Sequence, residues 1–351
     1  MMKYKNIIAG ILIALSIYSC EEESSLTPSL VDEDRVASQV DLSKSLVKDM
    51  YENYGCGILY DFDFTLDFAY TASSRSEAAK WEKVDIEMLD AADVDFALDF
   101  LSENVFQYFK ENISFNGIDY TTAYILDYLP YKVLVCDEIS TPSIGLMDVL
   151  DLSDSRATET GDGVLHSLGN DHSFAFGVNR TVVENSAQRY SEYRNDNFFL
   201  FLTYTMDTHD LYDELPQSFY EYSTAYLDRN IGEVYEEEGN VVDEYGLVDK
   251  SWFFEKGFVD ARYFYNDPNG LTNITVEGET INKAIKSGYD FVPTKRMFAY
   301  SYVNELIHTD AEALVDYPEY IKEKFQILIE TFMEWGIDIV SFNPDLATLY
   351  N

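Results

Sequence analysis

The clearest candidate for chemistry is a helical stretch that carries one histidine near its end. Residues at three- and four-residue spacing predict a helix over residues 198–215, which Pro216 stops. Two His four residues apart on such a helix, with Glu after the first, bind one zinc ion and take a proton from its water. The pentad here reads Thr205-Met206-Asp207-Thr208-His209. A hydroxyl and a thioether replace a ligand and the base at Thr205 and Met206, so this mechanism cannot run.

The remaining histidines offer one other metal set. None of the four is followed by Glu, so no shift of register recovers the motif: His166, His172, His209 and His308. A helix expected over residues 298–314 should face the first one, and His209, Glu305 and His308 plus water would suit zinc. Met206 still supplies no base. Histidines packed in the core are the alternative that we favour, so no cofactor is expected and zinc stays a possibility.

Several elements must position these residues. Strict alternation predicts a strand over residues 60–70, with Asp61, Asp63 and Asp67 on its solvated face. Apolar residues at helical spacing predict a helix over residues 86–113 that packs on the sheet. Further strands are expected at residues 131–136 and 173–178, and a polar acidic loop at residues 229–250.

The last helix shows one apolar stripe. It should begin after Asp316 and Pro318 and end at Gly336. Its stripe holds Ile321, Phe325, Leu328, Phe332 and Trp335. We interpret this stripe as core.

Several segments together resemble one family. They are Leu215-Pro216-Gln217-Ser218-Phe219, residues 222–226, Gly257-Phe258-Val259, residues 298–314 and residues 322–338. They are similar to the substrate import-associated zinc metallohydrolase lipoproteins, also described as zinc-binding metallopeptidases. The resemblance implies an α+β, zincin-like metallopeptidase fold with a small mixed sheet and long helices. Where that family has its acidic third ligand, this chain reads Asn304-Glu305-Leu306-Ile307-His308, and only Glu305 matches.

The N-terminal residues are typical of a bacterial lipoprotein. Residues 1–19 form a signal peptide with Lys3 and Lys5 before an apolar run, and Cys20 follows as the lipidated residue. Residues 20–30 form a tether, whose acidic start resembles a surface-export tag. We expect an outer-membrane, lipid-anchored protein that faces the cell surface. Residues 31–351 would then be one zincin-like domain, with an insertion at residues 264–297.

Composition limits the partners. The chain has 24 Lys and Arg against 64 Asp and Glu, a net charge of −40, which repels nucleic acid and anionic headgroups. Aromatic residues make up 15% of the chain, and Trp252, Tyr263 and Tyr265 are candidate binding residues, with core packing as the alternative. Cys56 and Cys136 could pair in an exported protein, but two buried free thiols are the simpler expectation.

Three functions follow from these observations. The leading hypothesis is a catalytically degenerate member that binds peptide or glycoprotein-derived material. The resemblance implies work beside a TonB-dependent importer and its partner lipoprotein. The alternatives are an active zinc metallopeptidase with non-standard ligands, and an adhesion or structural lipoprotein.

Overall fold

The computed structural model describes residues 35–68, 84–122, 124–140, 164–170, 172–241, 248–259, 274–276, 279–281 and 292–350. The chain divides into residues 1–39 and residues 40–351, and only helix α2 (Arg35–Gln39) is described in the first unit. The predicted signal peptide, Cys20 and the tether lie outside the described residues, as do Tyr263 and Tyr265. All that follows concerns the second unit.

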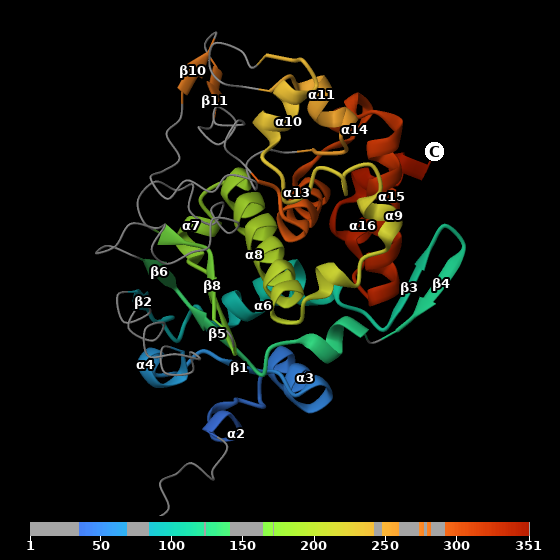
Figure 1. Ribbon diagram of the computed structural model, residues 1–351. Coiled ribbons are helices and arrows are strands. Elements are labelled where there is room, and N and C mark those ends of the chain that lie inside the picture. The colour runs from blue at the N-terminus through green and yellow to red at the C-terminus, as the bar shows by residue number, and fades with distance from the viewer. Residues whose placement is uncertain are drawn as a thin grey trace, which may run out of the picture. The chain divides into compact units, whose positions relative to one another are not determined.

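The largest sheet of the described residues is four-stranded and mixed (Figure 1). Its order is β1 (Gly57–Leu59), β5 (Lys132–Cys136), β9 (Ser173–Gly177) and β8 (Ser167–Gly169). The first three strands are parallel, and β8 runs antiparallel to β9 at the outer edge. Every residue of β5 and β9 is buried, as expected for strands covered on both faces. The strands predicted at residues 131–136 and 173–178 are therefore confirmed.

Smaller strands form three further sheets. The first is antiparallel and contains β2 (Asp85–Glu87), β6 (Glu138–Ser140) and β7 (Val164–Leu165). The second is a hairpin of β3 (Asn112–Phe115) and β4 (Ile118–Thr121), and the third pairs β10 (Ile274–Val276) with β11 (Glu279–Ile281). Together with the helices, these sheets confirm the mixed α+β class.

The long helix α8 (Ala187–Thr208) lies across the four-stranded sheet. It follows β9 through the short helix α7 (Arg180–Val183), and the Ser186 side chain accepts the Arg189 N–H at its start. Phe201 of α8 lies 5.2 Å and 5.4 Å, between ring centroids, from Phe174 and Phe176 of β9. The sheet therefore holds one face of α8 through aromatic packing.

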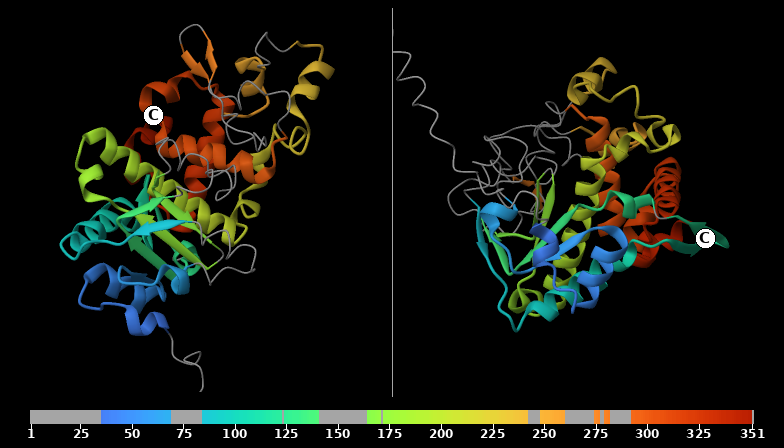
Figure 2. Two further views of the ribbon diagram at one scale, coloured as in Figure 1. Left: turned by 90° about the vertical axis from the view of Figure 1, so that its left-hand side faces the viewer. Right: turned by 90° about the horizontal axis from the view of Figure 1, so that it is seen from below.

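Two helices from the C-terminal part lie on the side of α8 away from the sheet (Figures 1 and 2). They are α13 (Lys295–His308) and α15 (Glu319–Trp335). The predicted stripe of α15 is buried at every position, and Gly336 caps the helix with a φ of 88°, which favours glycine. The prediction for the last helix is confirmed.

The remaining helices complete the unit. The α-helices are α3 (Ser45–Tyr54), α4 (Phe64–Asp67), α6 (Val94–Asn104), α9 (Gln217–Tyr220), α10 (Ile231–Glu237), α11 (Lys250–Glu255), α14 (Ala311–Asp316) and α16 (Ile339–Phe342). The 3-10 helices are η3 (Phe106–Tyr108), η4 (Tyr124–Tyr128), η7 (Leu211–Asp213) and η9 (Pro344–Tyr350). None of the helices in the described ranges is long and apolar enough to cross a membrane.

The strand predicted over residues 60–70 is wrong where the chain is described, up to Phe68. Strand β1 ends at Leu59, and residues 64–67 form α4. Asp63 caps this helix, because its side chain accepts the Leu66 N–H at 3.0 Å. Asp67 is fully buried 4.0 Å from Lys132 rather than on a solvated face. A side chain that can cap a helix has overridden the alternating pattern.

Three other predicted bounds are corrected. The helix expected over residues 86–113 is confined to α6, with β2 before it and β3 after it. The loop expected over residues 229–250 contains α10, capped by Asn230. The helix expected over residues 298–314 is divided into α13 and α14 by Thr309 and Asp310. Most of the insertion expected at residues 264–297 lies outside the described residues.

The two described cysteines are buried free thiols, as expected. The Cys136 thiol donates to the Phe176 carbonyl oxygen at 3.2 Å. Burial raises the pKa of Cys56 to about 12 and also raises the pKa of Cys136.

Candidate functional site

The end of α8 lies earlier than the sequence predicts. The helix ends at Thr208, and His209 is the residue that follows its last turn. Asp210 then adopts a left-handed conformation with a φ of 53°, and η7 begins after it. The helix predicted to continue to residue 215 is therefore wrong beyond Thr208, because a backbone reversal at Asp210, and not Pro216, ends it.

The two degenerate motif positions face the core. Thr205 and Met206 are both 0% exposed. The Thr205 hydroxyl donates to the Phe201 carbonyl oxygen one turn earlier, at 2.9 Å. Both side chains are therefore enclosed by the core, whereas His209 is exposed to solvent.

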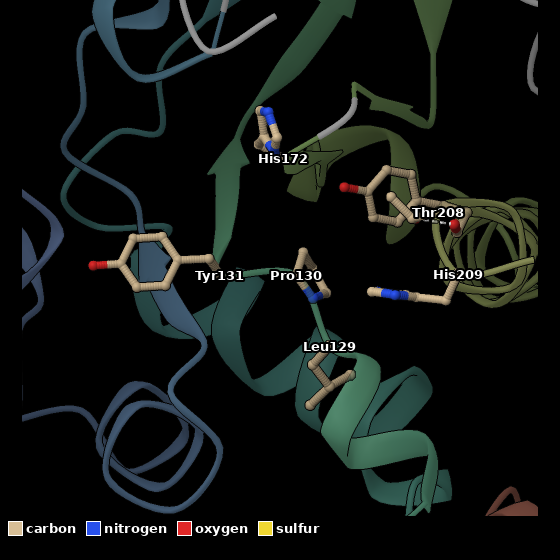
Figure 3. Close-up of a pocket in the computed structure, with 7 residues that line it drawn as sticks. Leu129, Pro130, Tyr131, His172, Thr208 and His209 are labelled. Carbon is tan, nitrogen blue, oxygen red and sulfur yellow. Dashed lines mark hydrogen bonds between the residues drawn. The ribbon is translucent and has the colours of Figure 1, made fainter. Parts of the chain in front are cut away.

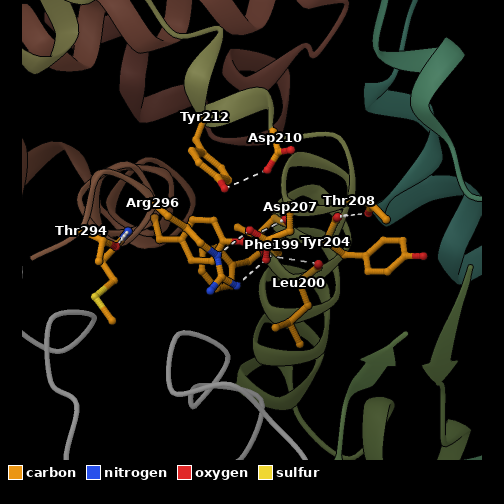
Figure 4. A network of polar contacts seen from close by, with 12 residues as sticks. Phe199, Leu200, Tyr204, Asp207, Thr208, Asp210, Tyr212, Thr294 and Arg296 are labelled. Carbon is orange, nitrogen blue, oxygen red and sulfur yellow. Dashed lines mark hydrogen bonds and ion pairs between the residues drawn. The ribbon is translucent and has the colours of Figure 1, made fainter. Parts of the chain in front are cut away.

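Helices α8 and α13 pack antiparallel, and three contacts define their register. Arg296 donates to both carboxylate oxygens of Asp207 (Figure 4). The Tyr300 hydroxyl donates to the Thr203 carbonyl oxygen at 3.1 Å. His308 Nε2 lies 3.4 Å from Asp196 Oδ1. As the residue number rises along α13, the facing residue number on α8 falls.

This register separates the predicted metal ligands. His308 lies against Asp196, which precedes His209 by 13 residues. At about 1.5 Å per residue, that offset places the two histidines roughly 20 Å apart along α8. Glu305 accepts instead from the Tyr317 hydroxyl at 2.9 Å. The prediction that the two helices face each other is confirmed, but His209, Glu305 and His308 do not meet.

The register creates a partly buried cluster that the sequence does not reveal. Asp196 accepts from His166 Nδ1 at 2.8 Å and faces His308 from its other oxygen. His308 Nδ1 donates to the Asn304 carbonyl oxygen at 2.9 Å. Burial raises the pKa of Asp196, but the hydrogen bonds and electrostatic interactions with His166 and His308 outweigh it, so the net pKa is lowered. The separations of 30 and 112 residues give no local pattern that could have predicted this cluster.

His209 belongs to a different site, a cavity of about 310 Å³ at the end of α8 (Figure 3). Its imidazole is directed toward Pro130, whereas the ring of Tyr131 points away from it. The cavity is lined by Leu129, Pro130, Tyr131, His172, Tyr204, Thr208 and His209. The lining thus includes two imidazole rings and the phenol ring of Tyr204, and none of the described lining residues is Lys, Arg, Asp or Glu.

The sheet topology brings these residues together. Residues 129–131 precede β5, and His172 precedes β9. Because these two strands are parallel neighbours, the residues before them meet at one end of the sheet. The C-terminal end of α8 adds Tyr204, Thr208 and His209 there. Sequence reasoning identified His209 but missed His172 and Tyr204, since neither belongs to a local motif.

Trp252 has a structural role in the described part of the chain. It is 8% exposed, and its indole Nε1 donates to Glu238 at 2.7 Å. Lys256 Nζ lies 5.1 Å from the Trp252 ring centroid and pairs with the same carboxylate. The hydrogen bond from Trp252, followed by that from Lys256, lowers the pKa of Glu238. Trp252 is thus held by a polar network rather than offered to a ligand.

No group of three or more His, Cys, Asp or Glu side chains within the described ranges is arranged to hold a metal ion. A scan against protein-family models found no match, and searches of curated proteins and of solved structures found none either.

Proposed function

We propose that this protein is a lipid-anchored binding protein of the outer-membrane surface, with a zincin-like fold and a degenerate zinc site. It binds peptide or glycoprotein-derived material beside a TonB-dependent importer and its partner lipoprotein. The observation that carries the proposal is the position of the motif residues. Thr205 and Met206 are buried in the core, while His209 lines an aromatic cavity.

The order of elements supports the zincin-like assignment. In many zinc hydrolases strands of the sheet precede the helix that carries the zinc ligands. Here β8 is antiparallel to β9 at the edge of the sheet, and β9 leads through α7 to α8. This support concerns the fold, because one fold hosts many functions.

The cavity supports binding rather than hydrolysis. A working zinc site needs three protein ligands around one open position. The α8–α13 register keeps His308 near Asp196 and far from His209, so an active enzyme built on His209 with Glu305 or His308 is disfavoured. Aromatic rings with a few polar groups are typical of ligand pockets of this size.

Metal content tests the claim that the zinc site is degenerate. The full chain with Cys20→Ala, which cannot be lipidated, is purified, and its zinc is measured by mass spectrometry before and after chelation. A His209→Ala variant is measured beside it. We expect less than one tenth of a zinc ion per chain in both proteins. One zinc per chain that disappears in His209→Ala would overturn the proposal in favour of a metallohydrolase.

Binding assays and lipid labelling test the claims that the protein binds peptide or glycoprotein-derived material and is lipid-anchored. A pool of tryptic peptides and a pool of released glycans are titrated against the same protein with and without chelator. We expect binding of one pool that chelator leaves unchanged. In cells, a fatty-acid probe should label the wild-type protein and not Cys20→Ala. An adhesion or structural role would instead give no binding of either pool.

A further inference from the structure

We infer that the cavity beside His209 binds the neutral ring of a sugar, either a single pyranose or a disaccharide. This inference rests on the proposed function and selects the glycan component of the proposed material. It is carried by the shape, the hydrogen-bonding capacity and the charge of the cavity walls.

The first wall is the ring of Tyr204, which is held in place from behind. It lies 5.0 Å, between ring centroids, from Phe174 of β9. It also lies so close to β8 that a Cβ atom on Gly169 would be 2.5 Å from Tyr204 Cδ2. Only glycine at residue 169 allows this approach. The position of the ring is therefore set before any ligand arrives.

The second wall is the imidazole of His209, which is supported by a row of rings. Tyr128 lies 4.8 Å from it, Tyr124 lies 4.9 Å from Tyr128, and Trp335 of α15 lies 5.8 Å from Tyr124. A flat ring that packing already orients loses little entropy when a ligand stacks on it. The C–H face of a pyranose is a suitable partner for such a ring.

The cavity also has unused hydrogen-bonding capacity. The imidazoles of His172 and His209 are exposed, and neither forms a hydrogen bond to another residue in the described part of the chain. A neutral imidazole offers one donor and one acceptor. A hydroxyl group can serve either nitrogen, because it both donates and accepts. A ligand rich in hydroxyl groups therefore matches these walls in either tautomer.

Charge and strand pairing disfavour other ligands. None of the described residues that line the cavity is Lys, Arg, Asp or Glu, and a chain with a net charge of −40 repels anions. The cavity adjoins β5 and β9, and each is already paired on both sides, by β1 and β9 and by β5 and β8 respectively. An extended peptide therefore cannot pair with β5 or β9, the two strands that His172 and residues 129–131 precede.

The experiment is a calorimetric titration of the purified full-length protein. The probes are glucose, galactose, mannose, N-acetylglucosamine and the β1,4-linked disaccharides of glucose and N-acetylglucosamine. We expect saturable binding of at least one neutral sugar. His172→Ala and His209→Ala should each weaken that binding at least tenfold. Tyr222→Ala, which changes an aromatic residue that is 59% exposed and outside the cavity, should not alter it.

The other possible outcomes distinguish the sugar-binding inference from the proposed function. Binding of peptides with no binding of any neutral sugar would overturn this inference and leave the proposed function standing. Sugar binding that both histidine variants leave unchanged would also overturn it, because the sugar would then occupy another site. Binding of neither sugars, glycans nor peptides would overturn the inference and the proposed function together.

Discussion

Asp196 and His308 lie against each other across the contact between α8 and α13, with Asp196 Oδ1 3.4 Å from His308 Nε2. The second Asp196 oxygen accepts from His166, which is 3% exposed. One carboxylate thus joins the segment before β8 to two helices. Because the pKa of Asp196 is lowered in the folded protein, its charged form stabilises the fold.

Asp196→Asn should lower the free energy of unfolding at pH 7 by about 3 kcal/mol, since it removes the carboxylate partner of the buried His166 and of the half-buried His308. A group with a lowered folded pKa contributes stability above its unfolded pKa, here 3.8, and loses it as the pH falls through the folded value. The difference between wild type and Asp196→Asn should therefore shrink below pH 3.8.

Urea unfolding at pH 7 and at pH 3 measures this difference. Asp61→Asn is the matched control, because Asp61 is exposed, and it should change stability little at either pH. A difference between wild type and Asp196→Asn that stays constant over this range would show that the carboxylate charge does not hold the three segments together.

The free energy of unfolding should rise as the pH increases above 8, because Lys324 is buried in the folded protein. It is 2% exposed and donates to the carbonyl oxygens of Phe219 and Glu221. Burial lowers its pKa from 10.5 to about 8, against the opposing effect of the Glu221 charge. Below pH 8 both folded and unfolded chains hold the proton and the full cost of burying the charge is present. Above that pH the folded chain releases the proton first, so the cost declines.

The gain across the whole window amounts to at most about 3 kcal/mol. Denaturant unfolding from pH 7 to pH 9.5 should show unfolding free energy rising with pH in the wild type, and a flatter profile in Lys324→Met. Lys48→Met, at an exposed position, should keep the wild-type profile. An unchanged slope in Lys324→Met would assign the effect to other groups.

Gly169→Ala should destabilise the protein by about 2 kcal/mol, because the new Cβ atom would displace the Tyr204 ring. In Tyr204→Ala the shortest contacts are gone and only Phe174 Cδ2, at 3.2 Å, stays close, so the same change at residue 169 should cost less. A double-mutant cycle from thermal unfolding measures this coupling. Additive effects of the two substitutions would mean that the contact between Gly169 and Tyr204 does not constrain the ring.

Restoring the motif residues should not restore a zinc site. Thr205→His with Met206→Glu places an imidazole ring and a charged carboxylate at positions that are 0% exposed. In addition, His209 lies beyond the end of α8. We expect a loss of several kcal/mol in stability and no added zinc. Zinc per chain and urea unfolding are measured on the double variant. Met206→Leu is the control of similar size and should cost about 1 kcal/mol or less. A stoichiometric zinc ion in the double variant would contradict the buried placement of these residues.

Local patterns predicted the elements whose signals are carried by residues close together in the chain. These signals are the apolar stripe of α15, the short apolar runs of β5 and β9, and the caps at Pro318 and Gly336. The alternating pattern after Leu59 predicted a strand where the chain forms α4, because the Asp63 side chain caps this helix and so competes with strand pairing.

The sequence by itself determined that Thr205 and Met206 cannot serve as a zinc ligand and its base, since that follows from the chemistry of a hydroxyl and a thioether. Only the tertiary structure decided which side chains meet. The antiparallel register of α8 and α13 pairs His308 with Asp196, and the parallel pairing of β5 with β9 brings His172 to His209's cavity. Such contacts join residues far apart in the chain, and the packing of whole elements sets them rather than any local spacing.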